Sequence, residues 1–203
     1  MSGLLIGLTG SLGSGKSTVL KIFEQLGART ISADAVVHDL LEDEEIKKEL
    51  KAMFGQEIFD NNGQIDRKKL AQLVFSDQEA RKRLEELLHP LVYERVNDFY
   101  LEQPQGITVA EIPLLFETES QGRFHKVITV YTTPEISVKR LKARGMTPDE
   151  IEARLKSQLP IETKLEKADF IIDNSRGLDA TKKQVQEIMA QLRLEETRNQ
   201  HET

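Results

Sequence analysis

The chain has 203 residues, of which 34 are acidic and 28 basic, giving a net charge of −6. An acidic chain is a poor ligand for nucleic acid or an anionic membrane surface, so we expect neither partner. The chain contains no cysteine, which excludes disulfides, thiolate nucleophiles and Cys-ligated metal centres. It has no apolar segment of membrane-spanning length and no basic stretch typical of a signal peptide, so we expect a soluble, cytoplasmic protein.

The first 32 residues predict a strand, a glycine-rich loop, a helix and a second strand. Residues 4–9 are apolar at consecutive positions, which is typical of a strand buried on both faces of a parallel sheet. Residues 16–26 carry apolar side chains at helical spacing and are followed by Gly27, a common helix terminator. Residues 29–32 fit the second strand. Together these elements have the size of a βαβ unit.

The middle of the chain has helical patterning from residue 35 to residue 102. A capping box at residues 76–79 predicts a helix over 79–88, and His89-Pro90 is expected to end it, with Pro90 opening the next helix. No Gly/Ser/Pro-rich linker borders this region. We therefore expect residues 35–103 to be a helical insertion packed against a core of residues 1–34 and 104–203.

The rest of the chain predicts three further strands, at residues 107–112, 126–131 and 169–173. Two helices that begin with Thr-Pro, at 133 and 147, lie between the last two strands, and residues 178–194 predict a terminal helix. Strands that alternate with helices indicate a three-layer α/β fold with a mostly parallel sheet.

Residues 10–17 match the phosphate-binding pattern GxxxxGK[ST] in full. Glycines such as Gly13 and Gly15 let the backbone N–H groups surround phosphate oxygens, Lys16 reaches the β- and γ-phosphates, and the Ser17 hydroxyl ligates Mg²⁺. The loop lies between a buried strand and an amphipathic helix, as the motif requires, so we expect a nucleotide site. The dinucleotide fingerprint GxGxxG and the guanine-reading Asn-Lys-x-Asp are both absent, which favours a small-molecule kinase.

A kinase needs a group that orients and partly deprotonates the acceptor hydroxyl. Asp34, just past the second strand, is the candidate, and the alternative is that it caps the helix 35–41. Arg140 and Arg144 share one helix face and either stabilise the transferred phosphoryl group from a lid of about residues 140–160 or form a solvated basic face. Asn174 either forms a turn or borders the adenine.

Two more residues have alternative interpretations. Glu111, on the third strand, either contacts Mg²⁺ through water or is a partly buried acid paired with a lysine. His89 has no catalytic partner nearby in the sequence, so the residues alone favour a structural role at a helix end.

Several motifs make the chain resemble the dephospho-CoA kinase family over nearly its whole length. The two most specific are Leu88-His89-Pro90-Leu91-Val92 and Ile112-Pro113-Leu114-Leu115-Phe116-Glu117, whereas the phosphate loop is generic. The others are Gly7-Leu8-Thr9-Gly10 through Thr18, Ile31-Ser32-Ala33-Asp34, Ile65-Asp66-Arg67-Lys68-Lys69-Leu70, Arg140-Leu141 with Arg144, Arg154 with Ser157-Gln158, and Ala168-Asp169 through Asn174. The departures are small: Ser32 and Ser137 stand where an acid and a glutamine are common.

The resemblance implies a P-loop kinase fold with a five-stranded parallel sheet, a helical substrate-binding insertion and a helical lid. It implies ATP-dependent, Mg²⁺-requiring phosphorylation of the ribose 3′-hydroxyl of dephospho-CoA, the last step of coenzyme A biosynthesis, and we expect a monomer. The implied catalytic residues are Asp34, Lys16 and Arg140. The resemblance assigns ATP to Gly13, Ser14, Gly15, Lys16, Ser17, Thr18, Arg144 and Asn174, the acceptor to Thr9, Asp34, His89, Pro113, Leu114 and Leu115, and the metal to Ser17.

Two other functions remain as alternatives. One is a different small-molecule kinase of the same fold, such as a nucleoside or nucleotide kinase. The other is a switch protein that binds ATP without transferring its phosphate, against which Asp34 argues.

Overall fold

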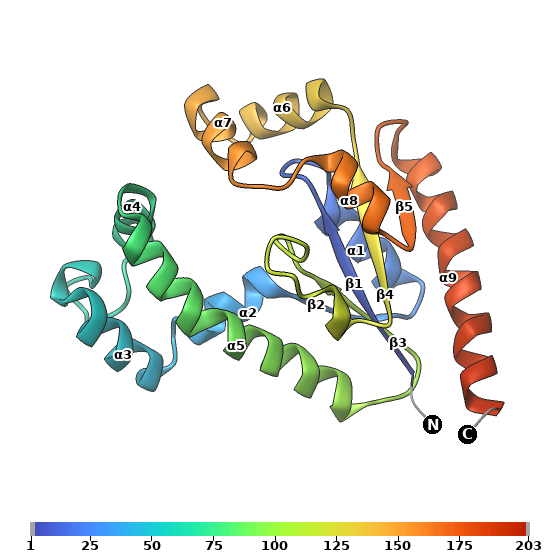
Figure 1. The fold of residues 1–203 in the computed structure, drawn as a ribbon, viewed down its shortest axis with the longest axis horizontal. Helices are drawn as coiled ribbons and strands as arrows, with labels where there is room; N and C mark the ends of the chain where they lie inside the picture. Colours follow the sequence, from blue (N-terminus) through green and yellow to red (C-terminus); the bar gives the residue numbers. More distant parts are fainter. Residues whose placement is uncertain (1–2, 202–203) are drawn as a thin grey trace. The chain divides into compact units, whose positions relative to one another are not determined.

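The computed structural model describes residues 3–201, and within them five strands form one parallel sheet (Figure 1). The strands are β1 (Leu4–Gly10), β2 (Arg29–Ser32), β3 (Ile107–Glu111), β4 (Lys126–Tyr131) and β5 (Phe170–Asp173). Their order is β2-β3-β1-β4-β5, and every neighbouring pair is parallel. The predicted α/β fold and its five-stranded sheet are confirmed, with strand ends within one residue of those expected.

The chain divides into two compact units, one made of the described residues up to Ser32 and from Tyr100 onward, the other of residues 33–99. The first unit holds the sheet, α1 (Lys16–Gln25), α6 (Pro134–Ala143), α7 (Pro148–Lys156), α8 (Ile161–Lys167), α9 (Leu178–His201) and a short 3₁₀ turn, η2 (Gln121–Arg123). The second unit holds α2 (Ala33–Leu40), α3 (Glu44–Phe54), the 3₁₀ turn η1 (Gln56–Ile58), α4 (Arg67–Ser76) and most of α5 (Gln78–Glu102).

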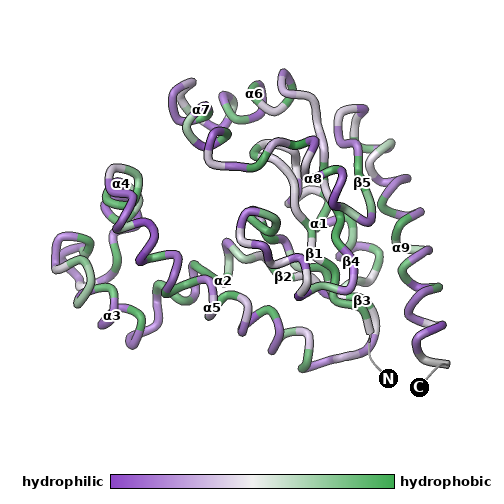
Figure 2. Tube along the Cα trace, viewed as in Figure 1, coloured by the Kyte–Doolittle hydropathy of each residue, from purple (hydrophilic) through white to green (hydrophobic). Residues whose placement is uncertain are grey.

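The core of the first unit lies between the sheet and the helices α1 and α9. β1 is buried at every residue because it is the central strand, and Figure 2 shows hydrophobic residues along the strands. The side chains that complete this core are Val19, Ile22 and Phe23 from α1 and Val185, Ile188, Met189 and Leu192 from α9. Each large apolar side chain buried here contributes roughly 1.5–3 kcal/mol, so the sheet is a rigid base for the loops at its carboxyl edge. Within residues 3–201, no helix has the length and apolar character needed to cross a membrane.

The side chain of Gln184, on α9, is hydrogen-bonded to the backbone of the edge strand β5. The backbone N–H of Asp173 donates to Oε1 of Gln184, and Nε2 of Gln184 donates to the carbonyl oxygen of Asp173, both at 2.9 Å. Both backbone polar groups of Asp173 are thus hydrogen-bonded to the amide of a helix residue.

α5 is one continuous helix, which corrects the expected break at His89-Pro90. Proline removes a hydrogen bond from a helix interior and costs about 3 kcal/mol relative to alanine. The helix continues because Leu88, Val92 and Val96 on its apolar face are buried, so packing on both sides of Pro90 outweighs the local preference.

The start of α5 also differs from the predicted capping box. The carboxylate of Asp77 accepts hydrogen bonds from the backbone N–H groups of Glu79 (2.8 Å) and Ala80 (3.1 Å). Ser76 ends α4, and its hydroxyl donates to the carbonyl of Gln72 at 2.9 Å. Asp77 is therefore the N-cap, because its side chain reaches two N–H groups of the first turn.

Pro90→Ala should stabilise the protein by about 1–3 kcal/mol, because Pro90 is exposed and alanine restores the missing backbone hydrogen bond. Urea unfolding monitored by circular dichroism measures the change. Asn97→Ala, another exposed position of α5, is the control and should stay within about 0.5 kcal/mol of the parent. A loss of stability in Pro90→Ala would show that the proline ring itself packs in the folded state.

Candidate active site

The phosphate loop, residues 10–17, connects β1 to α1 and depends on glycine at two positions. Gly13 and Gly15 have φ values of 77° and 93°, a region that side chains rarely allow. A Cβ atom at Gly15 would lie 2.2 Å from Nδ2 of Asn174. The side chain of Asn174 can therefore lie this close to the loop only because residue 15 is glycine. Gly15 precedes the first turn of α1, whose N-terminal end faces the loop with a positive dipole.

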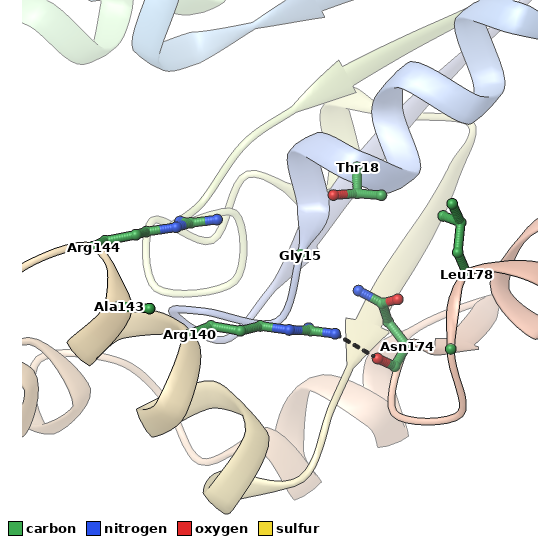
Figure 3. A pocket seen from close by; sticks show the side chains of 8 residues that line it. Gly15, Thr18, Arg140, Ala143, Arg144, Asn174 and Leu178 are labelled. Carbon is green, nitrogen blue, oxygen red and sulfur yellow. Dashed lines mark hydrogen bonds between the residues drawn. The ribbon is translucent and has the colours of Figure 1, made fainter.

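Side chains from two other parts of the first unit bind the carbonyl groups of this loop. Arg140, on α6, donates to the carbonyl oxygens of Gly13 (3.4 Å) and Ser14 (3.1 Å), and Nδ2 of Asn174 donates to that of Ser14 (2.7 Å). Arg140 also donates to the carbonyl of Asn174 at 3.0 Å (Figure 3). These donors offset the negative ends of the peptide dipoles, which favours an anionic ligand at the loop.

The side chain of Arg140 is half-buried, so the solvated-face interpretation is wrong for this residue. Arg144, one turn further, is exposed. Both arginines contribute to a pocket of about 390 Å³ beside the loop (Figure 3). The pocket is lined by Gly15, Thr18, Arg140, Ala143, Arg144, Asn174, Gly177 and Leu178. Its volume is in the range of small-molecule sites, and its two arginines favour a negatively charged ligand.

Lys16 and Ser17 begin α1 at the end of the loop. Nζ of Lys16 donates to the carbonyl oxygens of Gly10 (3.1 Å) and Ser11 (3.2 Å). Oγ of Ser17 donates to Oε1 of Glu111 at 3.2 Å, which places a hydroxyl and a buried carboxylate side by side. This oxygen pair fits Mg²⁺, which commonly takes one or two protein oxygens and completes its octahedron with phosphate and water. In the part of the chain that the structure describes, no group of three or more His, Asp or Glu side chains forms a metal site by itself.

Asp34 belongs to the second unit, in the first turn of α2. The helix begins at Ala33, so Asp34 is not its N-cap and the capping interpretation is wrong. Its carboxylate is exposed and has no hydrogen bond or ion pair with any residue that the structure describes. Ser32, two residues earlier, ends β2 opposite Glu111 in the parallel register.

The residues expected to contact an acceptor are in different environments. Thr9 is buried, and its Oγ1 donates to the carbonyl of Pro113 at 3.3 Å. Pro113 and Leu114 are half-buried, whereas Leu115 is fully buried, and its Cδ1 lies 2.5 Å from where a Cβ on Gly7 would be. Leu115 is therefore a core residue packed against β1.

His89 is half-buried within α5, in the second unit. Because α5 is continuous through this position, His89 does not end a helix.

Two polar contacts of the loop were not predicted from the sequence. Oγ of Ser137 donates to the carbonyl of Leu12 at 2.6 Å, and Oε1 of Gln158 accepts the Leu12 N–H at 2.9 Å. Ser137 lies three residues before Arg140 and so on the same face of α6, which is the one local signal that points to it. The contact of Gln158 joins residues 146 positions apart, beyond any spacing rule.

Asp173 holds the turn that carries Asn174. Burial raises the pKa of Asp173, but hydrogen bonds from the hydroxyl and backbone N–H of Ser175 and the charge of Arg176 outweigh it, so the pKa is lower than its usual value. The backbone N–H of Ser175 lies 2.9 Å from Oδ1, and Nε of Arg176 lies 3.1 Å from Oδ2. The carboxylate therefore stays ionised at neutral pH and stabilises the turn.

The β-loop-α motif, the parallel sheet and the arginine-bearing helix over the loop define a P-loop kinase. The chain belongs to the dephospho-CoA kinase family, whose model matches residues 4–180. A dephospho-CoA kinase from Nitrobacter winogradskyi is 41% identical over 192 residues, covering 92% of this chain and 94% of the relative. A solved structure from Thermus thermophilus superposes with a TM-score of 0.84 at 34% identity and covers 95% of this chain and 99% of its own. The dephospho-CoA kinase from Campylobacter jejuni superposes with a TM-score of 0.69 at 33% identity and covers 93% and 96%.

Asp173→Asn should reduce the dependence of stability on acid pH. A carboxylate whose pKa is lowered by folding stabilises the protein fully above its unfolded value, near 3.8, and loses that contribution as the pH falls through the folded value. The unfolding free energies of parent and variant, measured by denaturant titration between pH 6 and pH 3, should therefore converge towards acid. Parallel curves over this range would contradict the assignment.

Proposed function

We propose that the protein transfers the γ-phosphoryl group of ATP to the ribose 3′-hydroxyl of dephospho-CoA, giving coenzyme A and ADP. The observation that carries the proposal is the family match over residues 4–180, which includes a complete phosphate loop in its strand–loop–helix setting. Three curated relatives that are 38–41% identical and cover 92% of this chain are named dephospho-CoA kinases. We further propose that the enzyme acts as a monomer.

The phosphates of ATP are proposed to bind to the phosphate loop at the start of α1. The residues involved are Gly13, Ser14, Gly15, Lys16, Ser17 and Thr18. On binding, the Lys16 ammonium exchanges neutral carbonyl acceptors for charged phosphate oxygens, a stronger class of hydrogen bond. The pocket lined by Arg144 and Asn174 takes the remainder of the nucleotide, with Asn174 bordering the adenine.

Charge on the transferred group is stabilised by Lys16 and Arg140. Arg140 is held in place by three carbonyl groups, so it needs little reorganisation when charge develops on the phosphoryl oxygens. Ser17 and Glu111 are the residues that would hold Mg²⁺, which supplies charge neutralisation of the phosphates when bound.

The acceptor is proposed to bind to the unit of residues 33–99 and to Thr9, His89, Pro113 and Leu114. Leu115 is fully buried, so it is not among the proposed acceptor contacts. The exposed carboxylate of Asp34 takes the proton of the 3′-hydroxyl as its oxygen bonds to the γ-phosphorus. The bond between that phosphorus and the β–γ bridging oxygen breaks, and ADP leaves with the bond's electrons.

Asp34→Asn should lower kcat by about 10²–10⁴-fold, because the amide cannot accept the hydroxyl proton, while the Kd for ATP stays within about twofold. Mass spectrometry of dephospho-CoA incubated with enzyme, ATP and Mg²⁺ detects a product heavier by one phosphoryl group. Asp39→Asn, an exposed aspartate on the same helix, is the matched control and should keep full activity. If the parent protein released ADP without forming that product, the nucleotide site would stand but this acceptor would be excluded. No turnover by the parent would favour a nucleotide-binding switch.

Arg140→Ala should lower kcat by about 10²-fold or more while weakening ATP binding much less, because its charge acts chiefly on the transition state. Steady-state kinetics with each substrate varied separate the two effects. Lys139→Ala, an exposed neighbour on α6, should leave both constants unchanged. An unaltered kcat in Arg140→Ala would restrict Arg140 to supporting the loop.

A further inference from the structure

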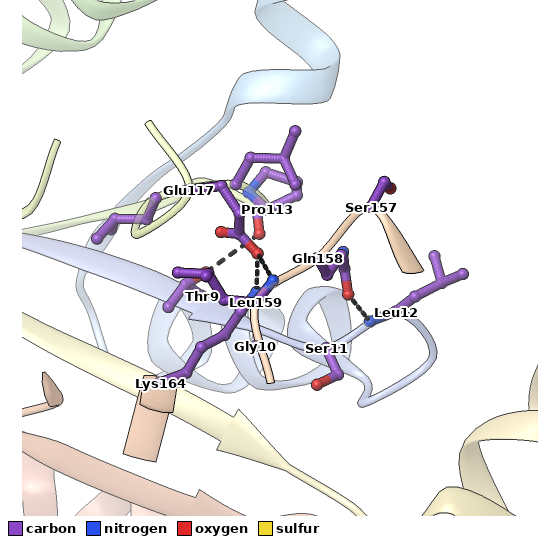
Figure 4. A network of polar contacts seen from close by, with 12 residues as sticks. Thr9, Gly10, Ser11, Leu12, Pro113, Glu117, Ser157, Gln158, Leu159 and Lys164 are labelled. Atoms are coloured by element: carbon purple, nitrogen blue, oxygen red, sulfur yellow. Dashed lines mark hydrogen bonds and ion pairs between the residues drawn. The ribbon is translucent and has the colours of Figure 1, made fainter. Parts of the chain in front are cut away.

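Two adjacent residues between α7 and α8 contact two different loops (Figure 4). Oε1 of Gln158 accepts the N–H of Leu12 in the phosphate loop at 2.9 Å. The N–H of Leu159 donates to Oε1 of Glu117, in the loop that follows β3, also at 2.9 Å. The segment 158–159 therefore connects the phosphate loop with the loop that carries Pro113 and Leu114.

Glu117 is a rigid attachment point because it is paired with a buried lysine. Nζ of Lys164, on α8, lies 2.6 Å from Oε1 of Glu117, and the side-chain exposures are 0% and 13%. The contact is an ion pair, since Nζ of Lys164 and Oε2 of Glu117 have no hydrogen-bond partner among the described residues. The backbone of Lys164 is itself held, since Oγ1 of Thr129 on β4 donates to its carbonyl at 3.2 Å. A buried ion pair adds little net stability to a fold. It does fix the positions of its two side chains, because separating them would leave an unpaired charge in the protein interior.

At the other end of the connection, Leu12 has both of its backbone polar groups bonded to side chains. Gln158 accepts its N–H, and Ser137 of α6 donates to its carbonyl at 2.6 Å. Leu12 immediately precedes Gly13, which has a φ of 77°, and the two are the central residues of a turn in which the Ser14 N–H donates to the Ser11 carbonyl at 3.2 Å. The orientation of the peptide at Leu12 therefore sets where the following N–H groups point.

We propose that Gln158 is a positioning residue for the phosphate loop and that the Glu117–Lys164 pair acts through it. The pair fixes Leu159, Leu159 fixes the adjacent Gln158, and Gln158 fixes Leu12. The inference rests on the proposed function only in taking the loop as the ATP-phosphate site. It needs no particular acceptor.

Gln158→Met tests the first link, because methionine has nearly the same shape and no comparable acceptor. The Kd for ATP with Mg²⁺, measured by calorimetry without acceptor, should rise about three- to tenfold, the effect of one ordinary hydrogen bond. The KM for ATP should rise equally, with kcat within twofold, and a cooperative melting transition shows that the variant is folded. Ser157→Ala, whose exposed hydroxyl donates to the carbonyl of Arg154, is the control. An unchanged Kd in a folded Gln158→Met protein would overturn the proposal.

Two double variants test the second link and differ in a single acceptor. Glu117→Met/Lys164→Met removes both charges and the acceptor of Leu159, and should raise the Kd for ATP about two- to fivefold. Glu117→Gln/Lys164→Met keeps an oxygen for the Leu159 N–H and should bind ATP as the parent does. Equal Kd values for ATP in the two double variants would overturn the role of Glu117. A cooperative melting transition shows that each double variant is folded.

Combining Gln158→Met with Glu117→Met/Lys164→Met tests whether the residues act in series. If they do, the combined variant should bind ATP no more weakly than Gln158→Met alone, because both changes release the same peptide. If the fold-increases in the Kd for ATP multiplied in the combined variant, Gln158 and the Glu117–Lys164 pair would act independently, and the proposal that they act in series would be overturned. Lack of turnover on dephospho-CoA by a parent that binds ATP would refute the proposed acceptor and leave the positioning result intact.

Discussion

The hydrogen bonds of Arg140 are the interaction on which the geometry of the site depends. One guanidinium group joins α6 to two carbonyls of the phosphate loop and to the carbonyl of Asn174 after β5. A lysine could not replace it, since an ammonium group on a flexible stem lacks the planar fork that reaches three acceptors at once. The loop, the helix that follows β4 and the turn that follows β5 are consequently positioned by the same side chain.

Around this arginine, the first unit combines a rigid apolar base with polar contacts at one edge. The central strand β1 is buried along its whole length, and its last residue, Gly10, begins the phosphate loop. Glu111 ends β3 beside it, and Asn174 follows β5. Because parallel strands all finish at the same edge, three distant segments supply their polar groups to one place. The sheet order makes the site possible, and the glycines of the loop let the side chains approach it.

The sheet could be predicted because buried parallel strands are continuous apolar runs, and residues 4–9, 107–112 and 126–131 are such runs. The phosphate loop could be predicted because its chemistry is local to eight residues. The continuity of α5 could not, since Pro90 is a helix breaker locally and only the burial of Leu88 and Val92 shows why the helix persists. The environments of Gln158, Glu117 and Lys164 could not be predicted either, because each depends on a partner far away in sequence.

The amide of Gln184 has a consequence for how this molecule meets its neighbours. An open edge of a sheet presents backbone donors and acceptors to any extended peptide, which is how sheets aggregate or exchange strands. At Asp173, the side chain of Gln184 makes the donor and the acceptor contact that an added strand would make. β5 has four residues, and Ile171 on it is about half exposed. Without Gln184, this edge would present unpaired backbone groups beside an exposed apolar side chain, a combination that favours pairing with another strand. The amide of one glutamine on α9 thus occupies the hydrogen-bonding position of a sixth strand and prevents strand addition at this point of the sheet edge.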